Sequence, residues 1–115
     1  MTSRDQRAAK IAALNDACRQ NRGGSGRQVM TAGVNAEGPE FVMKALAAVA
    51  AFDAFTADND PCGEHDFGSV TIDDQTVFFK IDYYQSGSGY TAGAETPDHP
   101  DTTDRVLTIM LAEDY

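Results

Sequence analysis

The sequence lacks several features that mark other classes of protein. It contains no tryptophan and only two cysteines, Cys18 and Cys62, which show neither CxxC spacing nor a nearby cluster of histidines. A disulfide framework and a zinc site are therefore not predicted, and we expect two reduced thiols. Internal repeats are absent as well.

Long apolar segments are also missing. The longest mostly apolar run, residues 41–55, is interrupted by Lys44 and Asp53, whereas a membrane-spanning helix needs about 20 apolar residues. The first residues, MTSRDQRAAKIAAL, contain no apolar core followed by a small-residue cleavage site, so no signal peptide is indicated. These absences predict a cytoplasmic protein that does not associate with a membrane.

Basic residues are scarce in the second half of the chain. Residues 1–52 contain seven Lys or Arg and four Asp or Glu, a balance of +3, whereas residues 53–115 contain two and fourteen, a balance of −12. Because nucleic acids are bound mainly through Lys and Arg, this balance disfavours direct DNA or RNA binding by the second half. It favours cations and basic protein surfaces as partners, although carboxylates can also serve only to keep a small domain in solution.

A chain of 115 residues suits one hydrophobic core, so we predict a single domain over residues 1–115. Residues 4–20 have apolar side chains at spacings of three and four, which predicts an amphipathic helix that ends at the glycine-rich residues 23–26. A second helix is predicted from Pro39 to about Phe52, because proline suits the first helical position and the following alanines allow close packing on a sheet.

Strands are predicted in four of the remaining segments. Residues 28–34 are rich in β-branched and apolar side chains, and residues 69–73 and 75–84 alternate as the two strands of a hairpin do. Residues 85–101 have little to bury and are expected to form a long, mobile loop. The last segment, RVLTIMLAEDY, suits a strand or a short helix, and its β-branched residues favour the strand. The expected fold class is α+β, with two helices packed on a mainly antiparallel sheet of about four strands.

The densest polar cluster is the segment FTADNDPCGEHDFG, residues 55–68. It contains five side chains that can bind a cation or exchange a proton, namely Asp58, Asp60, Glu64, His65 and Asp66. Carboxylates with one imidazole suit Mg²⁺ or Mn²⁺, and His65 beside Asp66 suits a general base. A calcium loop is disfavoured, because Ser69 occupies the position where such a loop requires a bidentate Glu.

The same segment is also interpreted as an ordered loop with no chemistry of its own. In that interpretation Asp58 or Asn59 caps a turn and His65 forms a local hydrogen bond. Phe55 and Phe67 then anchor the two ends of the loop in the core.

Three tyrosines further along the chain are candidates for an aromatic recognition surface: Tyr83, Tyr84 and Tyr90. Tyr83 also fits the buried alternation of its strand, which favours core packing for that residue.

Three segments of the chain, FTADNDPCGEHDFG, VFFKIDYY and VLTIMLAEDY, resemble motifs of a bacterial family of small domains of unknown function, found on chromosomes and mobile elements. The similarity extends over most of the chain. The resemblance implies no established activity for any residue. It suggests an association with plasmids and with neighbouring anti-defence genes, and an aromatic residue at the position of Cys62 in relatives argues against a role for that thiol.

Two functional hypotheses follow. The first is a small acidic, non-enzymatic binding or inhibitor protein, of the anti-CRISPR or antirestriction kind, that blocks the basic nucleic-acid-binding surface of a defence effector. Its expected contact residues are Asp58, Asp60, Glu64, His65, Asp66, Asp73, Asp74 and Asp82. The second is a metal-dependent hydrolase that uses Asp58, Asp60, Glu64, His65 and Asp66. The first is favoured, because dispersed acidity serves a surface whereas catalysis requires side chains that converge. It assigns no catalytic residue and no cofactor, with a divalent metal at the cluster as the alternative.

Overall fold

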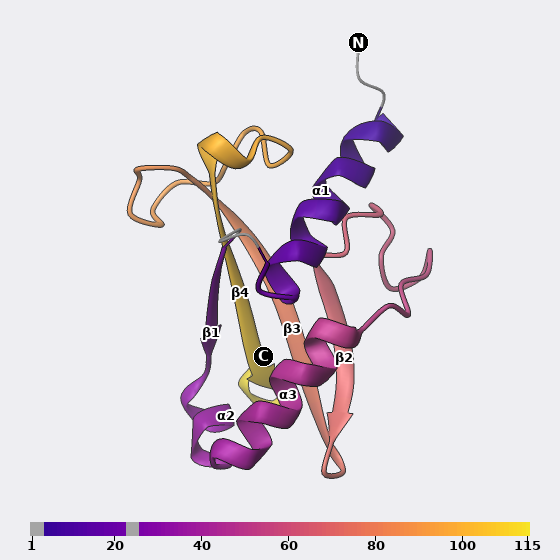
Figure 1. The fold of residues 1–115 in the computed structure, drawn as a ribbon, viewed down its shortest axis with the longest axis vertical. Coiled ribbons are helices and arrows are strands. Elements are labelled where there is room, and N and C mark those ends of the chain that lie inside the picture. The colour runs from indigo at the N-terminus through magenta and orange to yellow at the C-terminus, as the bar shows by residue number, and fades with distance from the viewer. Residues whose placement is uncertain (1–3, 23–25) are drawn as a thin grey trace.

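The computed structural model describes residues 4–22 and 26–115, which form an α+β fold (Figure 1). In chain order the elements are α1 (Arg4–Arg19), β1 (Arg27–Met30), α2 (Ala32–Ala36), α3 (Pro39–Ala51), β2 (Phe67–Ile72), β3 (Gln75–Gln85), η1 (Pro100–Thr102), β4 (Thr103–Leu111) and η2 (Ala112–Asp114). Most of the glycine-rich turn predicted at residues 23–26 lies outside the described residues.

The four strands form one mixed sheet in the order β1-β4-β3-β2. Strands β2, β3 and β4 pair antiparallel, and β1 pairs parallel with β4. The mainly antiparallel sheet predicted from the sequence is therefore confirmed, and so is the strand at the C-terminal segment.

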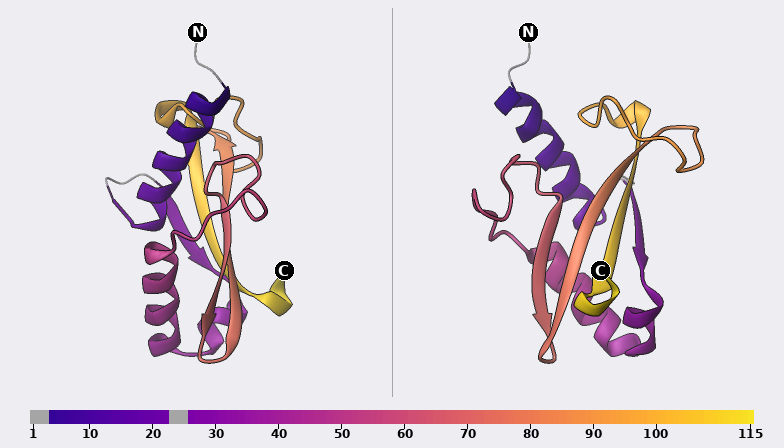
Figure 2. Two further views of the ribbon diagram at one scale, coloured as in Figure 1. Left: turned by 90° about the vertical axis from the view of Figure 1, so that its right-hand side faces the viewer. Right: turned by 180° about the vertical axis from the view of Figure 1, so that it is seen from behind.

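The two long helices, α1 and α3, cover one face of this sheet and leave the other face open (Figure 2). Alternation along the strands explains this arrangement, because every second side chain of β3 and β4 points toward the helices. The core contains Cys18, Val34, Phe41, Ala45, Val49, Ile72, Val77, Phe79, Ile81, Leu107, Ile109 and Leu111. Burying one large apolar side chain of this kind stabilises a fold by about 1.5–3 kcal/mol.

The strand predicted over residues 28–34 was too long. Strand β1 ends at Met30, and Thr31 begins the short helix α2, which the sequence analysis missed. The Thr31 side chain accepts a hydrogen bond from the Val34 backbone N–H, which is the arrangement of a helix N-cap. The cap therefore overrides the strand preference of the β-branched residues at this point.

The hairpin of β2 and β3 is present as predicted. Asp73 and Asp74 form a two-residue turn, with φ of 49° and 68°. Positive φ at both positions is typical of the mirror-image turns that match the twist of a hairpin. None of the described helices is long and apolar enough to cross a membrane.

Candidate functional site

The acidic loop between α3 and β2, residues 53–66, is folded by its own polar side chains. Asn59 Oδ1 accepts a hydrogen bond from Thr56 N at 2.8 Å, and Asn59 Nδ2 donates to Ala54 O at 2.9 Å. Asp60 is buried, and its carboxylate accepts the backbone N–H groups of Glu64 and His65. Asn59, rather than the exposed Asp58, is thus the turn-capping residue.

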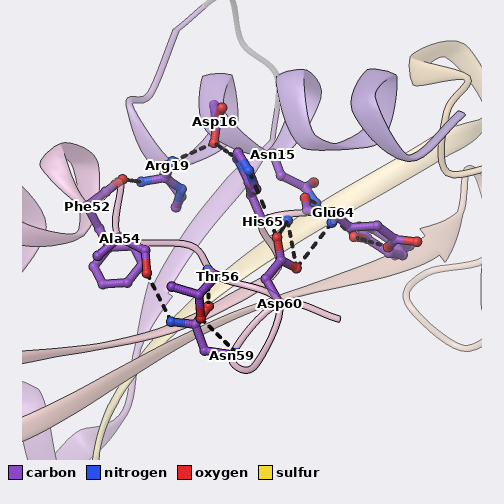
Figure 3. A network of polar contacts seen from close by, with 11 residues as sticks. Asn15, Asp16, Arg19, Phe52, Ala54, Thr56, Asn59, Asp60, Glu64 and His65 are labelled. Carbon is purple, nitrogen blue, oxygen red and sulfur yellow. Dashed lines mark hydrogen bonds and ion pairs between the residues drawn. The ribbon is translucent and has the colours of Figure 1, made fainter. Parts of the chain in front are cut away.

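His65 connects this loop to helix α1 (Figure 3). Its Nδ1 lies 2.9 Å from Asp16 Oδ1, and its Nε2 lies 3.9 Å from Asp60 Oδ2. The imidazole stacks on the ring of Phe55 with 4.0 Å between centroids and 3° between planes. The imidazole is therefore held between two carboxylates and an aromatic face, one carboxylate from α1 and one from its own loop.

Arg19 extends the same network to the end of α3. Its guanidinium donates to the carbonyl oxygens of Val49 at 2.7 Å and Phe52 at 2.9 Å, and also to Asp16. A cation that binds the last carbonyls of a helix is stabilising, because those carbonyls lack intrahelical partners. The guanidinium carbon also lies 5.2 Å from the centroid of the Phe55 ring. A single buried arginine thus ties α1, α3 and the base of the acidic loop together.

Asn15, one turn earlier on α1, is fully buried and connects the loop to the sheet. Its Nδ2 donates to Glu64 O at 2.9 Å and to Tyr83 Oη at 2.7 Å, and its Oδ1 accepts from Arg105 Nε at 2.8 Å. Tyr83 in turn donates to Glu64 Oε1 at 2.9 Å. Both N–H donors and the oxygen of the Asn15 amide therefore form hydrogen bonds.

Burial shapes the ionisation of the sheet residues in this network. It raises the pKa of the Tyr83 hydroxyl, which keeps the phenol protonated as a donor to Glu64. It also lowers the pKa of the Arg105 guanidinium, whose other contact is the carbonyl oxygen of Pro97. The Tyr83 hydroxyl and the Arg105 guanidinium thus form hydrogen bonds within the protein.

The structure brings together only part of the predicted contact set. Asp60, Glu64, His65 and Asp66 lie in one half-buried stretch, and Asp58 is exposed on the same loop. Two members of the set, Asp73 and Asp74, form the hairpin turn at the opposite end of β2. The last member, Asp82, lies on the open face of β3, where it pairs with Lys80 at 2.9 Å.

Residues 4–22 and 26–115 contain no group of three or more His, Cys, Asp or Glu side chains arranged to hold a metal ion. The contacts give a reason for this. Asp60 is engaged by backbone N–H groups, Glu64 by the Tyr83 hydroxyl, and His65 by Asp16. Three of the five side chains expected for a metal-dependent hydrolase are thus bound to the protein's own donors and acceptors.

Sequence reasoning missed Asn15, Asp16, Arg19 and Arg105. A signal was present for two of them, because Asn15 and Arg19 lie four and eight residues after Ile11, on the helix face that carries the buried apolar residues. Polar residues on a buried helix face require partners, and this requirement indicates a polar network. Their partners lie far away in sequence and were not predictable.

A cleft of about 680 Å³ separates the first turns of α1 from two loops. Its walls include Arg7 of α1, Glu64 of the acidic loop, and Glu95 of the segment that precedes η1. Arg7 donates to Asp98 at 3.1 Å, which attaches that second segment to α1. The cleft therefore lies where two acidic segments approach the same helix.

The two cysteines lie in different environments: Cys18 is buried in the core, and Cys62 is exposed in the acidic loop. Burial raises the pKa of the Cys18 thiol. Cys18 therefore serves as a small apolar core residue.

Asp66 gives a prediction about pH. Burial raises the pKa of its carboxyl, and the negative charges of Glu64, Asp60 and Asp82 act in the same direction. Because the folded state holds this proton more tightly than the unfolded chain, ionisation of Asp66 opposes folding at neutral pH, and this cost disappears at low pH, where the carboxyl is protonated in both states. We expect Asp66→Asn to raise Tm at pH 7 and to leave it nearly unchanged at pH 3, as measured by thermal unfolding. Asp58→Asn, at an exposed position, is the control and is expected to shift Tm at neither pH.

The fold and the site together define a small α+β domain with an acidic loop anchored on its first helix. The chain belongs to the family described as Protein of unknown function (DUF3768), which matches residues 30–114. The predicted membership of a family of unknown function is thereby confirmed. Helix α1 precedes the matched segment. Neither the curated proteins nor the solved structures contain a significant match to this chain.

Proposed function

We propose that this domain is a non-enzymatic binding protein, an inhibitor whose acidic end occupies the basic nucleic-acid-binding surface of a partner protein. The observation that carries the proposal is the distribution of charge over two loops. Residues 53–66 contain five Asp or Glu and residues 86–104 contain four, so the two loops carry nine carboxylates and neither contains Lys or Arg.

Both loops lie at the same end of the sheet, which we call the loop end. Strand β3 ends there, with Gln85 paired to Thr103 at the start of β4 (Figure 1). Strand β2 begins beside the middle of β3, with Phe67 paired to Lys80, and the acidic loop that precedes it reaches the cleft that Glu95 also lines. The opposite end contains the β2–β3 turn and η2, and we call it the hairpin end. Of the fourteen carboxylates of residues 53–115, nine lie in these two loops and four, Asp73, Asp74, Glu113 and Asp114, lie at the hairpin end. The larger negative charge at the loop end favours the approach of a basic partner there.

The anchoring of the acidic loop supports binding rather than catalysis. Asn15, Asp16 and Asp60 fix the loop backbone and the inner side chains. The outer carboxylates, among them Asp58 and Glu95, remain exposed and have no hydrogen bond or ion pair from their side chains among the described contacts. A surface that is already ordered loses less conformational entropy when it binds.

The neighbouring helix does not cancel this field. Arg7 is paired with Asp98, and the buried Arg105 contacts Asn15 and Pro97. The other cations in the first half of α1 are the exposed Arg4 and Lys10, against nine carboxylates in the two loops. The loop end therefore presents more unpaired negative than positive charge. In this respect it resembles the phosphate backbone that a nucleic-acid-binding protein normally binds.

A panel of purified CRISPR and restriction nucleases provides the test, with binding measured by biolayer interferometry. We expect at least one nuclease to bind, with an affinity that falls as salt is raised and that duplex DNA competes away. The absence of binding across the panel, or binding that duplex DNA leaves unchanged, contradicts the proposal.

A pair of matched double variants then locates the contact. Asp58→Asn with Glu95→Gln removes two exposed charges at the loop end, and we expect about a tenfold weaker affinity, roughly 1.4 kcal/mol. Asp74→Asn with Glu113→Gln removes the same charge at the hairpin end and is expected to leave the affinity within about twofold. Equal losses from the two double variants would show that net charge, and not the loop end, determines binding.

A further inference from the structure

The face of the sheet opposite the helices is uncovered and more apolar than a solvated face usually is (Figure 2). By register, the residues of all four strands that point to this face are Arg27, Val29, Phe67, Ser69, Thr71, Thr76, Phe78, Lys80, Asp82, Tyr84, Asp104, Val106, Thr108 and Met110. We call this surface the open face. Phe67 corrects the sequence analysis, since it packs here and not in the core under the helices.

Aromatic side chains form two groups on the open face. Phe67, Phe78 and Tyr115 form the first, with ring centroids 5.5 Å apart for the two phenylalanines and 5.6 Å apart for Phe78 and Tyr115. Tyr84 and Tyr90 form the second, with centroids 5.6 Å apart. Tyr115 is 77% exposed and Tyr90 is 44% exposed, so both groups present apolar surface to solvent.

Charged residues separate these two aromatic groups. Lys80 and Asp82 lie between Phe78 and Tyr84 on β3 and form an ion pair at 2.9 Å. Arg27 and Asp104 are the other charged residues whose strand positions point to this face. The open face is therefore electrically neutral on a chain with a net charge of −9.

We propose that the open face binds a second copy of this chain, sheet against sheet, about a two-fold axis. The axis lies between the two sheets, perpendicular to β3, and passes over Ile81. It places Lys80 of each copy opposite Asp82 of the other, because the two residues are equidistant from Ile81. The same rotation places Phe78 of each copy opposite Tyr84 of the other. The aromatic group that contains Phe78 in one copy therefore meets the group that contains Tyr84 in the other copy.

Charge complementarity selects this occupant. The open face offers a basic partner no net attraction, and its two acidic residues are balanced by Arg27 and Lys80. Of the four charged residues on this face, Lys80 and Asp82 at its centre are placed symmetrically about the axis, and this central pair is therefore complementary to itself. Packed sheets of this kind approach to about 10 Å and bury the aromatic side chains of both. The inference is independent of the proposed function, which uses the loop end.

Sedimentation equilibrium over a range of concentrations tests the proposal directly. The chain is expected to sediment at twice its monomer mass in the micromolar range. A monomer mass throughout the accessible range overturns the proposal. This is also the result expected if the open face binds a different protein and not a second copy.

Charge reversal on the open face distinguishes an intermolecular contact from a folding defect. Lys80→Glu makes both central residues negative and Asp82→Lys makes both positive, so each variant alone is expected to be monomeric. An equimolar mixture of the two is expected to form heterodimers, because opposite charges then face each other. Lys10→Glu, on the exposed side of α1, is the matched control and is expected to remain dimeric. A mixture that stays monomeric while circular dichroism shows both variants folded overturns the proposed contact.

Discussion

Replacement of Asn15 by leucine is expected to destabilise the folded domain by about 3–5 kcal/mol, in spite of the similar size of the two side chains. The amide of Asn15 bonds three groups that come from distant parts of the chain: Arg105 Nε, Glu64 O and Tyr83 Oη. Leucine removes all three bonds and leaves the Nε–H of the buried Arg105 without its acceptor. An unsatisfied buried polar group costs about 1–3 kcal/mol, and more when it is charged.

Urea denaturation followed by circular dichroism measures this effect. Asn35→Leu is the matched control, because Asn35 is an exposed residue of the short helix α2, and its substitution is expected to change stability by about 0.5 kcal/mol or less. Since small domains are stable by only about 5–15 kcal/mol, the Asn15 variant should unfold at a much lower urea concentration. A loss below about 1 kcal/mol would mean that the network centred on Asn15 contributes little.

Gly68→Ala is expected to cost about 1–3 kcal/mol, although it adds a single methyl group. Gly68 is buried in β2 directly opposite Phe79 of β3. A Cβ atom at this position would overlap the ring of Phe79 and lie 3.0 Å from Phe52 Cε1. Both rings also pack edge to face with each other, with centroids 5.3 Å apart. Neither ring can move away without disturbing the core.

The same measurement, applied to Gly93→Ala, supplies the control. A Cβ atom at Gly93 meets nothing within 4 Å, and the substitution reduces the entropy of the unfolded chain, so the variant is expected to be unchanged or slightly more stable. Equal stability of the Gly68 and Gly93 variants would indicate that the aromatic rings under Gly68 have room to shift.

The order of helices and strands was largely predictable from the sequence, because periodicity reports which face of an element is buried. The alternation of Val77, Phe79 and Ile81 gave β3, and its inward side chains are buried as expected. Short elements were less predictable. A single hydroxyl at Thr31 turns the chain from β1 into α2, and such a local hydrogen bond leaves no periodic pattern.

The candidate site was predictable in position but not in its contacts. The density of carboxylates and turn residues predicts an ordered polar segment at the acidic loop. The partner of His65 is 49 residues away, and the partner of Arg105 Nε is 90 residues away. Polar contacts at such separations depend on how the elements pack, which local pattern does not encode. Phe67 illustrates the same limit, since alternation assigns it to a face without revealing which face the helices cover.

Helix α1 lies outside the segment that matches the family, yet it provides Asn15, Asp16 and Arg19 to the centre of the polar network. In thermodynamic terms the helix behaves as an intramolecular ligand of the remaining fold. The short connection between α1 and β1 sets a high effective concentration for this ligand. The acidic loop is therefore coupled to the docking of α1. A molecule that binds preferentially when α1 is docked therefore also stabilises the ordered loop. A molecule that displaces α1 removes the contacts that hold the loop.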